Sequence, residues 1–445
     1  LVLAPRLFRT LDVGGLTVDF DNALFNSNTY KEDGFTLTSS APITLDPVLG
    51  PSAKSGGAIT LSSDDGSAFA LYSIDLAAAD GASAQVVITG RCVDSALPLA
   101  ALMHEFGWSA RDYDLIAAGS LAGHLIECGP QATGGLFTDW ETVEGWDNIG
   151  YPIVECRSDG SFVVTKPAGT GGLVTPATVA EQMLYEIGDP AAYLLPDAIC
   201  DFTAVRMSAD GPDRVRISGA VGEPPPPTLK VSLNSIGGFR NSVTFVLTGL
   251  DIEAKADLLR RQLAAAMTVT PAELDWTLAR TDHPDADTEE TASALLHCTV
   301  RDPDPAKVGR AFTGAGIELA LASYPGFHVT APPGEGQVYG AYAAGYVDAA
   351  EVPHIAVHAD GTRIDVAPAT ETLTLAPAEE PELPEPLPGG PTRRVPLGTI
   401  AGGRSGDKGG SANIGLWVRT EEQWRWLAHT LTVEKLRELL PETAD

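Results

Sequence analysis

The chain has 445 residues, with 59 acidic side chains against 29 basic ones and a net charge of −30. This length predicts more than one domain, and so acidic a surface repels phosphate backbones, which excludes nucleic acid as an expected partner. The five cysteines are isolated and odd in number, so neither a disulfide framework nor a structural zinc site is expected, and a reducing cytoplasm fits best. No apolar run approaches the length of a membrane span, so no membrane partner is expected.

The order of predicted elements defines the first three parts of the chain. Residues 1–65 show no pattern that indicates a chemistry, and their structure is unclear. Residues 66–250 alternate predicted strands and helices, which is typical of an α/β core. Residues 251–369 continue with an α+β pattern. The predicted fold class is therefore α/β and α+β, with an open α/β domain followed by α+β segments.

Two further parts complete the chain. Residues 370–394 form a linker, because six prolines fall between Pro377 and Pro391 among several glutamates, a composition that favours an extended, solvated chain. Residues 395–445 are too few to build a large core alone. We expect this last segment to dock on the rest of the chain or on a second copy, which predicts a homo-oligomer.

The first candidate site residues lie between a strand and a helix. The apolar run at residues 84–89 predicts a buried strand, and residues 95–106 predict the helix that follows. Arg91 and Asp94 fall in the turn between them, where open α/β sheets place ligands. Arg91 is a candidate for anion binding and Asp94 for catalysis. The alternative is an Arg91–Asp94 ion pair that only fastens the turn.

The next predicted helix, at residues 113–128, carries His124 and Glu127. Residues three apart share a helix face, so this pair can act as a general acid and base. It can also supply two metal ligands, but no third ligand is spaced to complete a set, and no metal is predicted. The alternative role for His124 is that of a structural histidine held by hydrogen bonds.

Two glycine-rich turns, GPQATGG at residues 129–135 and KPAGTGG at residues 166–172, bracket a predicted hairpin. The second turn leads into a predicted helix at residues 176–187 with Thr175 as its N-cap. Backbone N–H groups at a helix N-terminus beside a lysine form an anion site. The candidate anion-binding residues here are Lys166, Gly169, Thr170, Gly171 and Gly172. The alternative is a pair of tight turns without a ligand.

The last segment contains a second basic glycine turn, GGRSGDKGG. Its basic residues stand out in a very acidic protein, which indicates an anion pocket formed by Arg404, Ser405, Asp407 and Lys408. A surface hairpin tip in which Asp407 pairs with a basic neighbour is the alternative. Further on, TEEQ at residues 420–423 is a capping box and predicts the start of a helix.

Several long motifs resemble the acyclic terpene utilisation family, AtuA. They are VVITGRCVDSALPLAALMHEFGW at residues 86–108, AGSLAGHLIECGPQATGG at residues 118–135, the run from GYPIVECRSDG to AAYLLPD at residues 150–197, and RDPDPAKVGRA at residues 301–311. The run GTIAGGRSGDKGGSANIGLW at residues 398–417 resembles the small ferredoxin-like domain that ends many members. Residues 1–65 and the short final domain depart from the family pattern, so part of a site is expected to be missing.

The resemblance implies cytoplasmic catabolism of branched or isoprenoid acyl-CoA compounds, and it implies no catalytic residue set. We therefore expect a lyase or hydratase acting on a small molecule, a branched acyl-CoA or carboxylate, with coenzyme A present only as the thioester of the substrate and no further cofactor. His124 with Glu127 is expected to transfer protons. The alternative is a non-catalytic acyl-CoA-binding or scaffold subunit, favoured by the lack of a recognised nucleophile, metal or dinucleotide motif.

Overall fold

The structure, a computed structural model, describes residues 92–358, 362–375, 382–406 and 412–443. Before residue 92 it gives only the course of short strands, from β1 (Val2–Leu3) to β10 (Ser83–Gln85). Most of the strand predicted at residues 84–89 therefore lies outside the described residues. None of the described helices combines the length and the apolar character that a membrane span requires.

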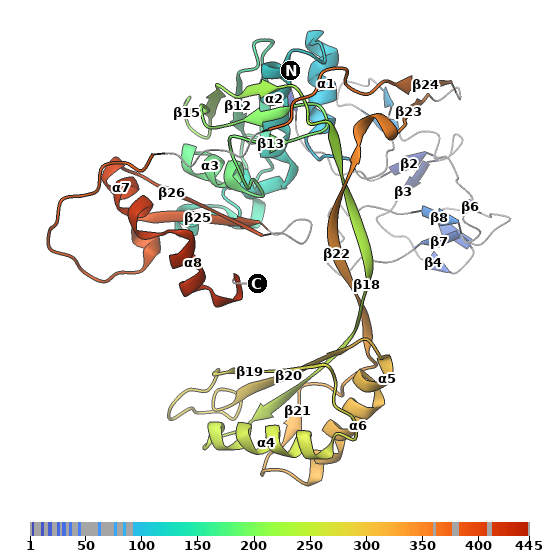
Figure 1. Cartoon of the computed structure of the whole chain (residues 1–445), viewed down its shortest axis with the longest axis vertical. Helices are drawn as coiled ribbons and strands as arrows, with labels where there is room; N and C mark the ends of the chain where they lie inside the picture. Colours follow the sequence, from blue (N-terminus) through green and yellow to red (C-terminus); the bar gives the residue numbers. More distant parts are fainter. Residues whose placement is uncertain are drawn as a thin grey trace. The chain divides into compact units, whose positions relative to one another are not determined.

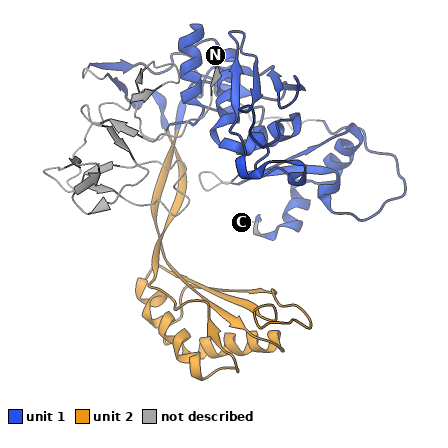
Figure 2. Ribbon diagram, turned by 180° about the vertical axis from the view of Figure 1, so that it is seen from behind, with its two compact units in different colours: residues 1–229, 347–445 blue, residues 230–346 orange. Residues whose placement is uncertain are grey.

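The chain divides into two compact units (Figure 2). Unit 1 consists of Leu1–Leu229 and Val347–Asp445, and unit 2 is the inserted segment Lys230–Tyr346. Each unit has its own hydrophobic core. The order of elements predicted a part that runs from residue 251 to residue 369. Unit 2 runs from Lys230 to Tyr346 instead, because its first and last strands pair with each other.

Unit 1 is built on an antiparallel sheet with the strand order β1-β11-β12-β16-β15, and a smaller sheet has the order β13-β14-β17 (Figure 1). The mixed helix and strand class is thereby confirmed. The described elements of its first part are α1 (Ala96–Phe106), α2 (Tyr113–Glu127), β11 (Ile153–Cys156), β12 (Phe162–Thr165), α3 (Pro176–Leu184), β13 (Tyr193–Leu194), β14 (Ile199–Asp201), β15 (Arg206–Ala209), β16 (Val215–Ser218) and β17 (Val221–Glu223).

Helix α2 is the centre of this unit, and its residues 116–126 are all buried. Its glycines explain how neighbours approach so closely. A Cβ atom at Gly123 would lie 2.7 Å from the Cα atom of Ser95, just before α1, and one at Gly119 would lie 2.8 Å from the Leu99 side chain. The helix predicted at residues 113–128 is confirmed, and small residues on its surface let α1 pack directly against it.

Unit 2 is a sheet with the order β19-β20-β18-β21, covered on one face by α4 and α6 (Figure 1). Its core holds Phe245, Leu259 and Phe312. Gly309 separates the two short helices Pro305–Val308 and Arg310–Glu318. The elements are β18 (Thr228–Leu247), α4 (Ile252–Ala266), β19 (Glu273–Ala279), β20 (Ala294–Asp302), α5 (Pro305–Val308), α6 (Arg310–Glu318), β21 (His328–Val329) and β22 (Gln337–Asp348), with β18 and β22 crossing into unit 1.

The chain then returns to unit 1. The returning elements are β23 (His354–Val357), β24 (Arg363–Val366), β25 (Ala401–Gly406), β26 (Asn413–Val418), α7 (Glu421–Thr430) and α8 (Val433–Leu439). The capping box is confirmed, because the Thr420 hydroxyl accepts from the Gln423 N–H and the Gln423 side chain accepts from the Thr420 N–H. The hairpin β25–β26 packs against α3, so the last segment docks on its own chain.

Candidate functional site

His124 lies in the buried part of α2, where its side chain is 3% exposed. Its Nε2 atom is 3.0 Å from the main-chain oxygen of Gln182 in α3, and the Gln182 side-chain amide donates to the main-chain oxygen of His124 at 3.1 Å. Because a carbonyl oxygen only accepts, Nε2 carries the hydrogen in this contact. The reciprocal bonds hold the imidazole in one orientation against α3.

The three predicted catalytic residues lie around Tyr193 of β13. The ring centroids of His124 and Tyr193 are 6.0 Å apart. Burial, followed by the charge of Glu127, raises the pKa of the Tyr193 phenol, so its hydroxyl stays protonated at neutral pH. The sequence does not indicate a role for Tyr193, because only the packing of β13 near α2 places it beside His124.

The three buried cysteines do not suit thiol chemistry, and the described carboxylates are not grouped as in a metal centre. Burial raises the pKa of Cys156 to about 11 and the pKa values of Cys200 and Cys298 to about 12, so these side chains are thiols and poor nucleophiles at neutral pH. The Cys128 thiol donates to Glu127 at 3.2 Å. Within the described ranges, no three His, Cys, Asp or Glu side chains are grouped as a metal site requires.

The KPAGTGG turn is a packed element of unit 1. Lys166 is 8% exposed, its Nζ atom donates to the main-chain oxygen of Thr170 at 2.8 Å, and it forms an ion pair with Asp213 at 3.1 Å. The N–H groups of Gly171 and Gly172 donate to main-chain oxygens of the preceding loop at 2.8 Å each. These donors therefore bind the protein itself. A Cβ atom added at Gly169 would meet no other atom within 4 Å.

The N-terminus of α3 is occupied in the same way. Thr175 is the N-cap, as predicted, and it forms a reciprocal capping box with Thr178. The N–H of Val174, just before it, donates to the carboxylate of Asp213 at 2.9 Å. The lysine and the amides on which the predicted anion site relied are engaged with Asp213 and with backbone oxygens, and anion binding at this turn stays a prediction.

A matched pair of glycine substitutions tests this packing role. A Cβ atom at Gly171 would lie 1.9 Å from the main-chain oxygen of Gly145, whereas Gly169, at φ +77°, has open space around it. We expect Gly171→Ala to lower the free energy of unfolding by about 3 kcal/mol through overpacking, and Gly169→Ala by only about 1 kcal/mol through its positive φ. Urea unfolding measures both, and equal losses would contradict the packing role.

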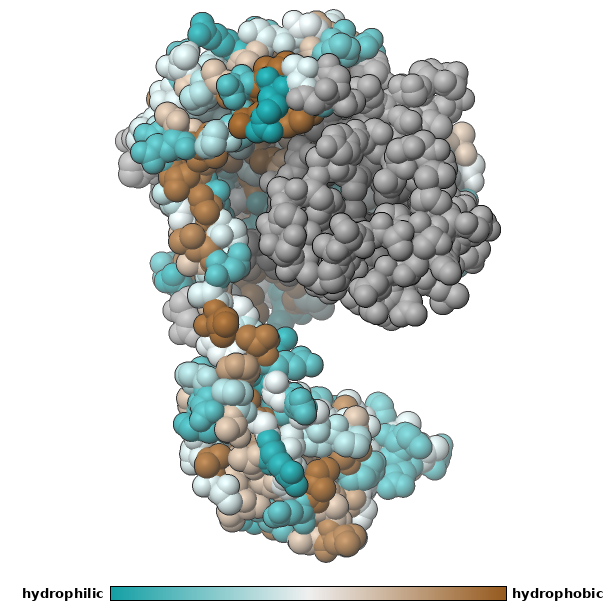
Figure 3. Space-filling view, turned by 90° about the vertical axis from the view of Figure 1, so that its right-hand side faces the viewer, coloured by the Kyte–Doolittle hydropathy of each residue, from teal (hydrophilic) through white to brown (hydrophobic). Residues whose placement is uncertain are grey.

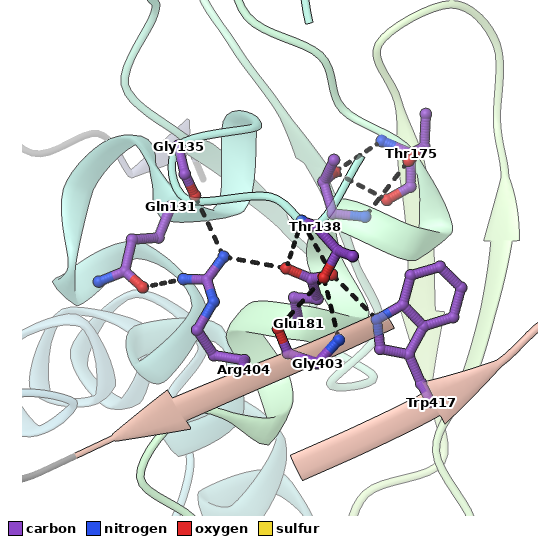
Figure 4. Close-up of polar contacts among 9 residues, drawn as sticks. Gln131, Gly135, Thr138, Thr175, Glu181, Gly403, Arg404 and Trp417 are labelled. Atoms are coloured by element: carbon purple, nitrogen blue, oxygen red, sulfur yellow. Dashed lines mark hydrogen bonds and ion pairs between the residues drawn. The ribbon is translucent and has the colours of Figure 1, made fainter. Parts of the chain in front are cut away.

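Arg404, predicted to bind an external anion, binds a carboxylate of its own chain. It is 5% exposed and forms an ion pair with Glu181 of α3 at 3.2 Å (Figure 4). It also donates to the main-chain oxygen of Gly135 at 3.1 Å and to the side chain of Gln131. Its guanidinium thus joins β25 to α3 and to the GPQATGG turn, and its binding of an external anion stays a prediction.

Glu181 is fully buried and accepts several hydrogen bonds. The donors besides Arg404 are the indole Nε1 of Trp417 at 3.0 Å and the N–H of Thr138 at 3.2 Å (Figure 4). Of the other predicted anion residues, Ser405 is exposed on β25. Arg91, Asp407 and Lys408 lie outside the described residues, and their roles stay predictions.

These contacts join into a buried polar seam, which we define as Ser120, His124, Gln182, Glu181 and Arg404. Its members come from α2, α3 and β25. Three of its atoms, Ser120 Oγ, Gln182 Oε1 and Arg404 Nε, are buried and have no hydrogen-bond partner among the described residues. An unpartnered buried polar group costs about 1–3 kcal/mol, so the seam is poorly explained by stability and is our candidate functional site.

The structure also contains cavities away from the seam. One of about 190 Å³ lies beside Asp114 and Asp159 in unit 1. Another, of about 630 Å³, lies beside Arg280 in unit 2, at the start of α4. Neither is lined by a residue predicted to belong to the site, so the chemistry-bearing residues and these cavities do not coincide.

The fold is that of a mixed α and β protein. Its buried polar seam contains His124, and the half-buried Tyr193 lies beside this histidine. Residues 74–358 match the family model described as acyclic terpene utilisation family protein AtuA. This range covers more than half of the chain and includes His124, Glu127 and Glu181, and the chain therefore belongs to the AtuA family. Neither a curated protein nor a solved structure matches the chain. The family match ends before residue 395, so the ferredoxin-like resemblance of the last segment stays a prediction.

Proposed function

We propose that this AtuA family member is an enzyme of acyclic terpene utilisation that acts on a branched acyl-CoA or carboxylate by a lyase or hydratase step. The observation that carries the proposal is the buried imidazole of His124. Its Nε2 is held by the Gln182 carbonyl at 3.0 Å, and the Tyr193 ring lies 6.0 Å from the imidazole. An oriented imidazole beside carboxylates and a protonated phenol is suited to proton transfer.

The chemistry of such a step matches these groups. Removing water from a 3-hydroxyacyl thioester takes a proton from the α-carbon and gives one to the departing hydroxyl. His124 accepts the first proton as the general base. The Tyr193 hydroxyl, kept protonated by burial and by the charge of Glu127, is a donor for the oxygen that departs.

The second half of the proposal concerns the residues that bind the anionic part of the substrate. Lys166 and Arg404 are paired with Asp213 and Glu181. Among the basic residues predicted for this role, Arg91 and Lys408 stay as candidates. Calorimetric titration with coenzyme A and with a branched acyl-CoA measures binding, and Lys166→Met is expected to weaken the fold of its turn without weakening the affinity.

Turnover of a panel of branched 3-hydroxyacyl-CoA and enoyl-CoA thioesters tests the proposal directly. We expect water to be removed from or added to at least one branched member, and the straight-chain analogue of the same length to react more slowly. Tight binding without turnover would replace the enzyme by the alternative, an acyl-CoA-binding subunit of a degradation complex. If the protein neither binds nor turns over any of these thioesters, acyl-CoA is excluded as the ligand.

A further inference from the structure

We propose that the open edge of strand β22 is a dimer interface, which pairs antiparallel with β22 of a second copy of this chain. The expectation of a homo-oligomer from the sequence rested on the last segment, and that segment docks on its own chain. The observations that carry the proposal come from unit 2 alone. They concern the ribbon, which we define as residues 230–238 of β18 and residues 337–346 of β22.

The ribbon is a two-stranded structure without other support. β18 pairs with β20 only from Phe239 onward, and within the described residues β22 pairs with β18 and with no further strand. Two-stranded ribbons are marginally stable in water. Each open edge presents unpaired N–H and C=O groups, which form a template for another strand.

The ribbon exposes large apolar side chains. Ile236 is 75% exposed, Tyr346 65%, Val338 58% and Leu233 53%. Apolar residues, brown in Figure 3, follow one another along the narrow ribbon. Several such side chains on one thin element are typical of an interaction site.

The charge pattern selects a second copy as the partner. The chain carries a net charge of −30, so two copies repel each other over most of their surfaces. The ribbon has no acidic residue, and β22 has no charged side chain of either sign before Asp348. The ribbon is thus a place where two copies can meet without burying like charges.

The edge of β22 suits pairing with itself better than that of β18. A two-fold axis places the same strand opposite itself, and like charges facing each other across strands are destabilising. β18 carries Lys230 and Arg240, whereas the middle of β22 reads YGAYAAGY. Its uncharged side chains include several glycines and alanines, which allow a close approach, and the result is a four-stranded sheet with β18 on both outer edges.

The oligomeric state of the full chain tests this inference. Light scattering after gel filtration, over a series of concentrations, is expected to give twice the mass of one chain. The variant Ala341→Lys with Ala344→Lys places charges on the exposed edge and is expected to halve that mass. The matched control is Ala264→Lys with Ala265→Lys, two exposed alanines of α4 in the same unit, and it is expected to remain a dimer.

Hydrogen–deuterium exchange of the wild type provides a test without substitutions. The amides of residues 337–346 are expected to exchange more slowly as the protein concentration rises. A monomer at all concentrations overturns the proposal. If the variant Ala341→Lys with Ala344→Lys is still a dimer and its melting temperature is unchanged, the proposal is wrong as well.

Discussion

Replacing His124 with glutamine is expected to lower the turnover of a branched thioester substrate by about 10²–10⁴-fold, the usual contribution of a general acid or base. The glutamine amide can still donate to the Gln182 carbonyl, as Nε2 does at 3.0 Å. It cannot accept and release a proton. The variant therefore removes the chemistry while it keeps the contact between α2 and α3.

The matched control is His297→Gln in unit 2. His297 is half-buried and also hydrogen-bonded, through Nδ1 to the Thr244 hydroxyl at 2.9 Å, and it lies in strand β20 of unit 2, which contains none of the predicted site residues. We expect the His297→Gln variant to turn over the substrate at the same rate as the wild type. If His124→Gln retains full turnover with a normal melting temperature, His124 is a structural histidine and the proposed mechanism is wrong.

Arg404→Met is expected to lower the free energy of unfolding by about 3–5 kcal/mol, because it leaves the carboxylate of Glu181 buried without its counter-ion. Methionine retains much of the apolar stem, so the loss reports mainly on the charge. Arg404 also carries the contacts from β25 to Gly135 and Gln131. Urea unfolding measures the loss, and limited proteolysis should cut the β25–β26 hairpin faster than in the wild type.

Two further variants separate the ion pair from general damage. Arg419 pairs with Asp139 at the surface, where the two side chains are 38% and 36% exposed. Arg419→Met is expected to cost no more than about 1 kcal/mol. Adding Glu181→Gln to Arg404→Met should recover part of the stability, since no charge stays buried. Equal losses for Arg404→Met and Arg419→Met would show that the buried pair does not hold the hairpin.

The local features of the fold could be predicted because their causes are local. The small and apolar residues of α2 give a helix over the predicted range, and Thr175 and Thr420 begin helices because each hydroxyl accepts an N–H from within the next turn. The motifs around His124 and Lys166 identified the AtuA family, and the family model bears this out. The grouping of His124 and Glu127 on one helix face likewise followed from helix geometry alone.

The tertiary structure decided which groups meet. A basic residue in a glycine turn requires a counter-charge, but the sequence does not say whether a ligand or the protein supplies it. For Lys166 and Arg404 the protein supplies it, through Asp213 and Glu181, both far away along the chain. Glu181 and Gln182 look like ordinary polar helix residues until β25 and α2 pack on them. The physical reason is that a polar group's partner depends on which segments share a dry interior, and only the packing of the whole unit determines that.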